Sequence, residues 1–289
     1  MIIMPKIAPL SKSVTHSAVS LALAEDLGRA GDITSQSVIP ENARAKASIV
    51  SREEGVLAGL DLAVESFIQN DPAAVFTSIV SDGANVSPGD TVLTIEANAR
   101  GLLSGERVAL NFVSHLSGIA SHTADFVAAI SGTQARITCT RKTTPGLRAL
   151  EKYAVRSGGG YNHRFGLDDA ILIKDNHIAV AGSVTAALKA AKGNAGHMVT
   201  VEIEIDTLEQ LDEALREGTD VVLLDNMTPD MLREAVTMVN GKATTEASGR
   251  VSLETVADIA RTGVDYISVG KITHSSPTMD FGLDMEIFN

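Results

Sequence analysis

The sequence predicts an α/β fold in two parts, and two observations carry that prediction. Over residues 1–100, short strand-like segments alternate with Gly and Pro-Gly-Asp turn signals after one long helical pattern. This is typical of an α+β module with a largely antiparallel sheet. From Ala135 onward an apolar strand is followed by a helix several times over. Such repeats predict parallel strands with right-handed crossovers, either as a (β/α) barrel or as a doubly wound open sheet.

In the first part, apolar periodicity predicts a helix over Val14–Leu27 that closes at Gly28, since glycine readily adopts the left-handed backbone at a helix end. Residues 102–131 carry a second helical pattern, which is interrupted near Gly118 and which we interpret as a hinge between the two modules. Strand-like pieces are expected between these helices, at 45–52, 74–80 and 82–97.

In the second part, the strands and helices alternate without exception. The helix that begins at Thr228 has a Thr-Pro-Asp start, which is a good N-terminal signal. Strands are expected at 135–140, 169–176, 199–206, 220–226, 242–249 and 265–272, and helices at 146–157, 183–192, 207–217, 228–239 and 252–262.

Composition narrows the function. The formal net charge of −12 argues against nucleic-acid and membrane-surface binding, because both rest on basic patches. The N-terminus has no long apolar stretch and no run could span a bilayer, so we expect a cytoplasmic protein. Cys139 is the single cysteine, which excludes an internal disulfide. We interpret it as a core residue, since it lies mid-strand between two threonines.

Carboxylates recur where the strands of the second part end. Glu204, Asp225 and Glu246 follow one another at a constant step of 21 residues, which predicts equivalent positions on one rim of a barrel. In "VEIEID", Glu202, Glu204 and Asp206 share one face, and helices would cover the opposite, apolar face. Inward carboxylates are costly unless they are paired or bind a metal or ligand. Neutralisation of buried lysines is the alternative, more for Glu202 than for Glu204, which lies nearer the rim.

Cations converge on the same predicted rim. Arg141 and Lys142 follow the first strand, where alternation sends their side chains in different directions, and Lys174 ends the second strand. His163 and Arg164 lie in a loop after three consecutive glycines, which allow the backbone to approach a ligand closely. Each cation alone could be an ordinary surface charge. Their convergence in an acidic protein predicts an anion site, and the neighbouring carboxylates suit a divalent metal or hydroxyl groups.

The last two strands end in "EASG" and "SVGKITHS". Glycines after the final strands of a barrel commonly bind phosphate through backbone N–H groups, which makes Ser248, Gly249 and Gly270 candidates. The residues together therefore predict a barrel that binds a phosphorylated sugar and a small polyanionic acid, with Mg²⁺ as a plausible cofactor.

Several blocks match a known family. "TRKTTPG", "SGGGYNHRFGLDDAILIKDNH", "VEIEID", "LLDNM", "EASGRVS" and "GVDYISVGKITHS" resemble the quinolinate phosphoribosyltransferases, also called nicotinate-nucleotide pyrophosphorylases, over nearly the whole chain. The resemblance implies an N-terminal α/β sandwich domain at 1–117, to which 276–289 returns, and an open irregular (β/α) barrel at 118–275. It implies a decarboxylating pentosyltransferase of de novo NAD biosynthesis. Such an enzyme converts quinolinate and phosphoribosyl pyrophosphate to nicotinate mononucleotide, pyrophosphate and CO₂ with Mg²⁺.

The resemblance also implies roles for residues of this chain. Catalysis would rest on Lys142, Lys174, Glu204 and Asp225, and the two carboxylates would hold Mg²⁺. A homodimer or higher even oligomer would share its active sites, with Arg107 reaching in from the other subunit. Quinolinate would contact Arg107, Thr140, Arg141, His163, Arg164 and Lys174; phosphoribosyl pyrophosphate would contact Lys142, Glu204, Asp225, Ser248, Gly249, Gly270 and His274.

Two other functions remain open at this point. A related phosphoribosyltransferase could use nicotinate or another pyridine acid, although a mono-acid would not need four cations for its carboxylate. A non-catalytic anion-binding barrel with a regulatory role is the second alternative. Against it, Glu204 and Asp225 would repel an anion unless a metal lay between them.

Overall fold

A computed structural model describes residues 7–78 and 80–287 of the chain. These residues form two compact units, which are described separately. The first unit comprises residues up to 124 together with 145–159 and the segment from 275, and the second comprises 125–144 and 160–274. No helix in the described part of the chain is long and apolar enough to cross a membrane.

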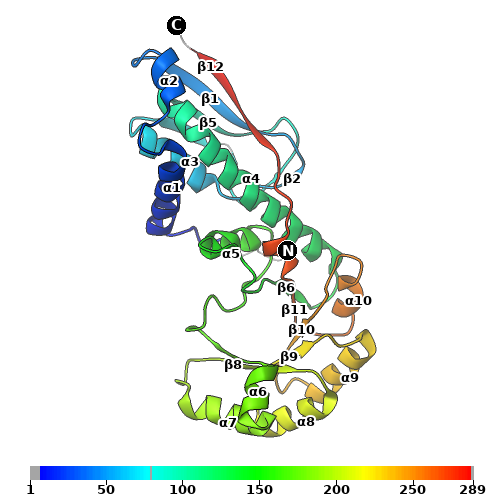
Figure 1. The fold of residues 1–289 in the computed structure, drawn as a ribbon. Coiled ribbons are helices and arrows are strands. Elements are labelled where there is room, and N and C mark those ends of the chain that lie inside the picture. Colours follow the sequence, from blue (N-terminus) through cyan, green and yellow to red (C-terminus); the bar gives the residue numbers. More distant parts are fainter. Residues whose placement is uncertain (1–6, 79, 288–289) are drawn as a thin grey trace. The chain divides into compact units, whose positions relative to one another are not determined.

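The first unit is built on an antiparallel sheet with the strand order β12-β1-β5-β3. Its inward residues alternate along β1, where Ala45, Ala47 and Ile49 are buried. The last strand of the chain, β12, pairs with the first, β1, so the C-terminal segment completes this sheet (Figure 1). The strands are β1 (Arg44–Ser51), β3 (Val75–Ser78), β5 (Thr91–Asn98) and β12 (Phe281–Ile287), and a small ladder joins β2 (Gly55–Val56) to β4 (Asn85–Val86).

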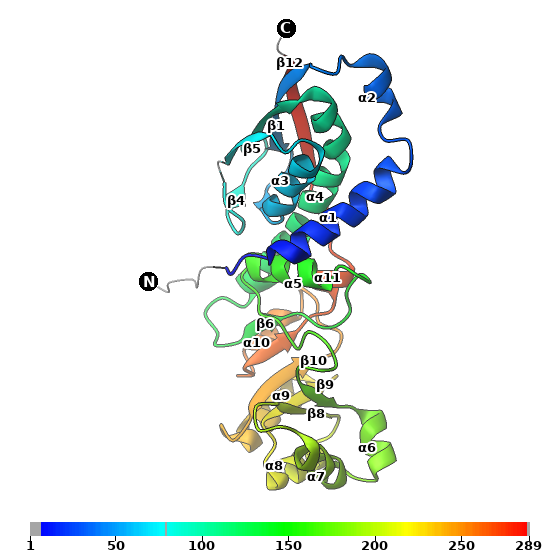
Figure 2. The same cartoon turned by 90° about the vertical axis from the view of Figure 1, so that its left-hand side faces the viewer.

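Helices cover this sheet and bury its apolar face. α1 begins at Lys12 after the Ser11 cap and ends at Leu27, where Gly28 has a φ of 52°, so the predicted helix and its glycine end are confirmed. Figure 2 shows α1 beside α3, which it contacts. The helices of the unit are α1 (Lys12–Leu27), α2 (Ile33–Val38), α3 (Leu60–Asn70), α5 (Arg148–Ser157) and α4 (Ala99–Ala129) as far as residue 124.

The predicted interruption at Gly118 is wrong, because α4 runs unbroken from Ala99 to Ala129. Gly118 is instead a contact site. A Cβ atom there would lie 2.0 Å from the carbonyl oxygen of Pro277, in the segment that leads to β12. The glycine thus allows that segment to pack directly on the helix, and it does not break the helix.

The expected second domain, 118–275, includes the residues of α5, but the structure places α5 in the first unit. Polar side chains of α5 explain this placement. The Tyr153 hydroxyl donates to Asp82 at 2.7 Å, and His115 Nε2 lies 3.1 Å from Oε1 of the fully buried Glu151. α5 therefore does not serve as an ordinary crossover helix between its two flanking strands.

The second unit is a six-stranded parallel sheet with the order β6-β11-β10-β9-β8-β7. In a closed barrel β6 would also pair with β7, but here these two strands are the edges, so the barrel is open, as predicted. All six predicted strands are present. They are β6 (Arg136–Thr138), β7 (Ile171–Ile173), β8 (Val201–Ile205), β9 (Val221–Asp225), β10 (Thr244–Ser248) and β11 (Tyr266–Ser268).

Helices α6 to α10 pack beside one another in chain order along the outside of the sheet (Figure 1). Two short helices were not predicted. α6 begins directly after Lys174, so β7 ends earlier than expected, and α11 follows Gly270. The helices are α6 (Asp175–Ala181), α7 (Val184–Asn194), α8 (Leu208–Glu217), α9 (Pro229–Val239), α10 (Val256–Ala260) and α11 (Lys271–His274).

Candidate active site

The carboxyl ends of the parallel strands bring the predicted residues together, but in two levels. Glu204 and Glu246 are both in register with Leu223 of the strand between them. Asp225 is in register with Ser248, one inward position further along. The constant step of 21 residues therefore does not give one common level, because successive strands are staggered. Glu246 lies a layer deeper than Asp225, and it is only 6% exposed.

Glu204 forms an ion pair with Lys174, which caps the N-terminus of α6. The Glu204 side chain is 11% exposed, whereas that of Lys174 is 47% exposed. Neutralisation of a lysine was expected more for Glu202 than for Glu204. The structure shows the reverse, and the lysine concerned is partly open to solvent and could reach a ligand.

Arg141 and Arg164 bring two positive charges close to each other. The Nε atoms of both residues are buried, and no acceptor in the described part of the chain reaches either atom. Burial lowers the pKa of the Arg164 guanidinium, and the charge of Arg141 lowers it further, while Glu202 acts in the opposite direction. Two guanidinium groups that repel each other, each with a buried and unpaired Nε–H, can bind an anion that enters between them.

Lys142 lies beside Gly270 and His274. A Cβ placed on Gly270 would lie 3.0 Å from Lys142 Cδ and 3.4 Å from His274 Cδ2, so these two side chains meet over the glycine. The Lys142 loop is held at both ends: its N–H donates to Thr140 Oγ1 at 3.0 Å, and its carbonyl accepts from Thr273 Oγ1 at 2.8 Å. Thr273 was not predicted, and its position on an unpredicted short helix left no sequence signal.

Asp225 ends β9 beside a second residue that the prediction missed. Asn226 has a left-handed backbone with φ 52°, its amide donates to the Asp225 carboxylate at 2.5 Å, and its N–H donates to the Ser248 carbonyl at 3.0 Å. Gly249 packs against Asn226, since a Cβ there would lie 2.8 Å from its Oδ1. In the sequence, Asn226 could have been recognised as an asparagine directly after a strand, because asparagine tolerates the left-handed backbone region better than most residues.

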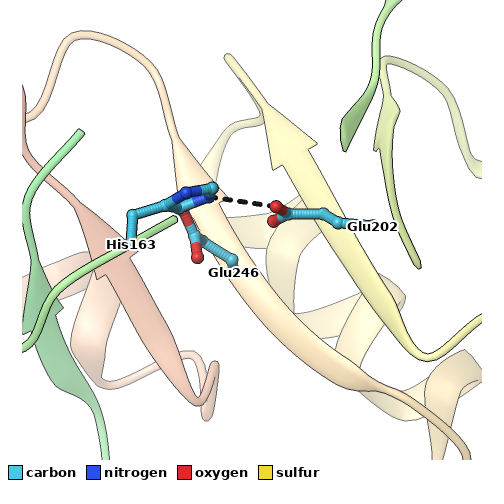
Figure 3. Close-up of side chains that lie close together, drawn as sticks. All are labelled: His163, Glu202 and Glu246. Atoms are coloured by element: carbon cyan, nitrogen blue, oxygen red, sulfur yellow. Dashed lines mark ion pairs between the residues drawn. The ribbon is translucent and has the colours of Figure 1, made fainter. Parts of the chain in front are cut away.

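Behind these groups lies a buried cluster of His163, Glu202 and Glu246 (Figure 3). His163 Nε2 is 3.0 Å from Glu202 Oε2 and 3.6 Å from Glu246 Oε1. Burial raises the pKa of Glu246 to about 7, and the charge of Glu202 adds to this shift. The second oxygen of Glu202, Oε1, has no hydrogen-bond partner among the described residues.

Two expectations concern residues outside this group. Cys139 is fully buried, with its Sγ 3.3 Å from Asn162 Oδ1, which confirms the core interpretation. Arg107 lies on α4 in the first unit, where it is exposed. There it lines a pocket of about 440 Å³ together with Asn111, Ser114 and Asp280.

Comparison with known proteins gives one consistent result. Models of the quinolinate phosphoribosyl transferase N-terminal and C-terminal domains match residues 32–117 and 119–284. A probable nicotinate-nucleotide pyrophosphorylase [carboxylating] of Bacillus subtilis is 47% identical over 265 residues, which cover 92% of this chain and 91% of that protein. The Mycobacterium leprae nicotinate-nucleotide pyrophosphorylase [carboxylating] is 48% identical over 277 residues, covering 93% and 96%.

A solved structure agrees with these sequences. The crystal structure of NadC from Streptococcus pyogenes superposes with a TM-score of 0.95 at 40% identity, covering 98% of this chain and all of that one. Two domain models that together match most of the chain, and relatives near half identical along their full lengths, decide the assignment. The chain belongs to the quinolinate phosphoribosyltransferase family.

Proposed function

We propose that the rim of the second unit carries out the quinolinate phosphoribosyltransferase reaction with the residues described above. The observation that carries this assignment is the pair of buried Nε atoms of Arg141 and Arg164, which have no acceptor among the described residues although the two charges repel each other. A dicarboxylate needs several such cations to hold it. Arg141, Arg164 and Lys174 would hold the two carboxylates, and Thr140 would line the same loop.

The sugar phosphate would occupy the other half of the rim. Lys142 and His274 meet over Gly270, so a phosphate bound there would contact both side chains. Ser248 ends β10 in register with Asp225, and Gly249 follows it. These residues would bind the 5′-phosphate and the pyrophosphate, with Lys142 between the two substrates.

Glu204 and Asp225 fit a magnesium ion. Both are carboxylates at the strand ends, and oxygen ligands are what Mg²⁺ prefers. The donors are also restrained, Asp225 by Asn226 and Glu204 by Lys174. When bound, Mg²⁺ would neutralise the pyrophosphate charge. Lys174 is then free to turn from Glu204 to the substrate carboxylate.

The chemistry needs no protein nucleophile. The pyridine nitrogen forms a bond to ribose C1 as the bond from C1 to pyrophosphate breaks, and the sugar carries positive charge in the transition state. Asp225 and Glu204 stabilise that charge, and Lys142 stabilises the leaving group. The ring nitrogen, now positive, stabilises the electron pair that remains on C2 when CO₂ departs. A proton then bonds to C2 and gives nicotinate mononucleotide.

Arg107 would act in a partner subunit of a homodimer or higher even oligomer. Its exposure on α4 and its position in a pocket of the first unit support this role, since a cation that only solvates a helix needs no pocket. We also propose a cytoplasmic enzyme.

Substrate choice can be tested directly. The purified protein is incubated with phosphoribosyl pyrophosphate, Mg²⁺ and quinolinate that carries a label in its 2-carboxylate, and labelled CO₂ is measured. Release of CO₂ that depends on both substrates is expected. Turnover of nicotinate with no CO₂ from quinolinate would favour the mono-acid alternative, and binding without turnover of either would favour a non-catalytic barrel.

A further inference from the structure

Both ring nitrogens of His163 have partners within the protein. Nδ1 accepts the backbone N–H of Arg164 at 2.8 Å, and Nε2 lies 3.0 Å from Glu202 Oε2. A ring nitrogen that accepts a hydrogen bond carries no proton, so Nε2 bears the only proton of the ring. The imidazole is therefore neutral and donates from Nε2 to Glu202. This differs from the cationic role that the sequence suggested for His163.

The same geometry argues against a metal ion in the cluster of His163, Glu202 and Glu246. The spacing of the three groups would suit one, since their ligand atoms lie within 4.8 Å of one another. A histidine that binds metal through Nε2 must place its proton on Nδ1 and donate it to an acceptor. Here Nδ1 faces a donor, the N–H of Arg164. Hydrogen bonding, not coordination, accounts for the arrangement in Figure 3.

We propose that Glu202 and His163 are positioning residues for Arg164: Glu202 fixes the neutral Nε2–H form of His163, and His163 Nδ1 then orients the Arg164 backbone. His163 acts on the dicarboxylate through Arg164 and not as a charged ligand. The inference rests on the proposed role of Arg164 in binding that substrate.

The surroundings of Arg164 support this order of contacts. On its C-terminal side the loop is fixed by Asp169, which accepts the N–H groups of Phe165 at 2.6 Å and Gly166 at 2.9 Å. The guanidinium donates from Nη1 to the Ala170 carbonyl at 3.0 Å. On its N-terminal side the contact from His163 is the one that holds the backbone N–H.

The carboxyl groups and the guanidinium groups around His163 act on the imidazole in opposite directions. Burial raises the pKa of Glu246 to about 7, and the charge of Glu202 adds to this shift, whereas a positive charge on His163 would lower it. Glu202 stabilises the Arg164 guanidinium against the repulsion from Arg141. A cationic His163 would add a third positive charge to a pair that already repels.

The protonation state can be measured without any assay. Nitrogen-15 imidazole spectra of the ligand-free enzyme near neutral pH, with the His163 signals assigned by their loss in His163→Asn, should show a protonated Nε2 and an unprotonated Nδ1. Two protonated nitrogens would overturn the inference. So would a change in the His163 signals on addition of Zn²⁺, since that would show coordination.

Kinetics test the positioning role. Glu202→Gln keeps an oxygen that can accept the Nε2 proton, so the quinolinate KM should stay within about threefold of wild type; Glu202→Leu removes the acceptor and should raise it about tenfold or more. The KM for phosphoribosyl pyrophosphate should change little in both variants. Equal effects on the two substrates would contradict the inference. Glu234→Gln, on the exposed face of α9, is the matched control and should match wild type.

Substitution of the histidine separates charge from hydrogen bonding. His163→Asn retains an acceptor near the Nδ1 position, whereas His163→Lys retains only a charge. The quinolinate KM should be lower for His163→Asn than for His163→Lys. The opposite order would show that His163 binds the substrate as a cation. If wild type fails to turn over quinolinate, the proposed site roles fail, while the nitrogen spectra still decide the state of His163.

Discussion

Single residues of the site differ most in how their charges are compensated. Lys174 forms an ion pair with Glu204, and Asp225 accepts a hydrogen bond from the amide of Asn226. The Nε atoms of Arg141 and Arg164, in contrast, have no acceptor within the described chain. A buried donor without a partner costs free energy until a ligand supplies the acceptor. These two atoms should therefore contribute more to substrate affinity than the exposed cations nearby.

Replacement of Arg164 by lysine tests this difference. Lysine keeps the charge but loses the planar fork and the buried Nε–H, so the quinolinate KM should rise about tenfold or more while the KM for phosphoribosyl pyrophosphate stays within about threefold. Steady-state kinetics with each substrate varied in turn give both values. Arg136→Lys is the control, because Arg136 packs on Tyr161 and Tyr266 and should leave both KM values unchanged. A rise in both KM values for Arg164→Lys would refute a specific role in dicarboxylate binding.

Glu246 predicts a pH dependence of stability. Its pKa is raised to about 7 in the folded protein, so its protonated form is the one that folding favours. That contribution is present below the unfolded pKa and is lost as pH rises toward and through 7. As pH rises from about 5 to about 8.5, the free energy of unfolding of Glu246→Gln should increase relative to that of wild type by about 1–3 kcal/mol, because the amide never ionises. Urea unfolding at several pH values measures this gain, and a constant difference between the proteins would contradict the shift.

Among the helices, α4 and α7 show that glycine can have opposite effects in the same kind of element. Gly118 in α4 is pressed against the Pro277 carbonyl, whereas a Cβ atom placed on Gly193 in α7 would have no atom within 4 Å. Periodicity alone cannot distinguish these cases, which is why Gly118 was mistaken for a break. The difference depends on a segment more than 150 residues away in sequence.

The two glycines give a matched pair of variants. Gly118→Ala should lower the free energy of unfolding of the first unit by about 1–3 kcal/mol, since the backbone of residue 277 must move to accept the methyl group. Gly193→Ala should raise stability by up to about 1 kcal/mol, because alanine is the better helix former and nothing obstructs it. Thermal unfolding of both variants measures the contrast. Similar changes of the same sign would show that the close contact at Gly118 is tolerated.

The elements also show what the sequence could predict. The six parallel strands followed from alternation of strand and helix patterns, and inward carboxylates followed from strand parity at Glu204. The different depths of Glu204 and Asp225 in the sheet could not be predicted, because the stagger between strands depends on how the strands pair and not on the spacing of residues in the sequence. The membership of α5 in the first unit depends on contacts with Asp82 and His115, which lie far away in the chain. The neutral state of His163 likewise required its partners to be seen.

At the scale of the whole molecule, the proposed role of Arg107 calls for a second chain. Arg107 lies in the first unit and the other predicted residues lie in the second. If each site takes residues from both chains, a mixed dimer of two different inactive variants collects both substitutions in one site and leaves the other site intact.

Mixing Arg107→Ala with Lys142→Ala tests this arrangement. Each variant alone should be nearly inactive, because every site lacks one of the two cations. After dissociation and reassociation of an equal mixture, about half of the dimers contain one chain of each kind. In such a dimer one site carries both substitutions and the other carries neither, so activity should recover to about a quarter of wild type. Mixing two samples of Arg107→Ala controls for the treatment itself. No recovery, although mixed dimers are detected by mass, would mean that Arg107 serves the site of its own chain.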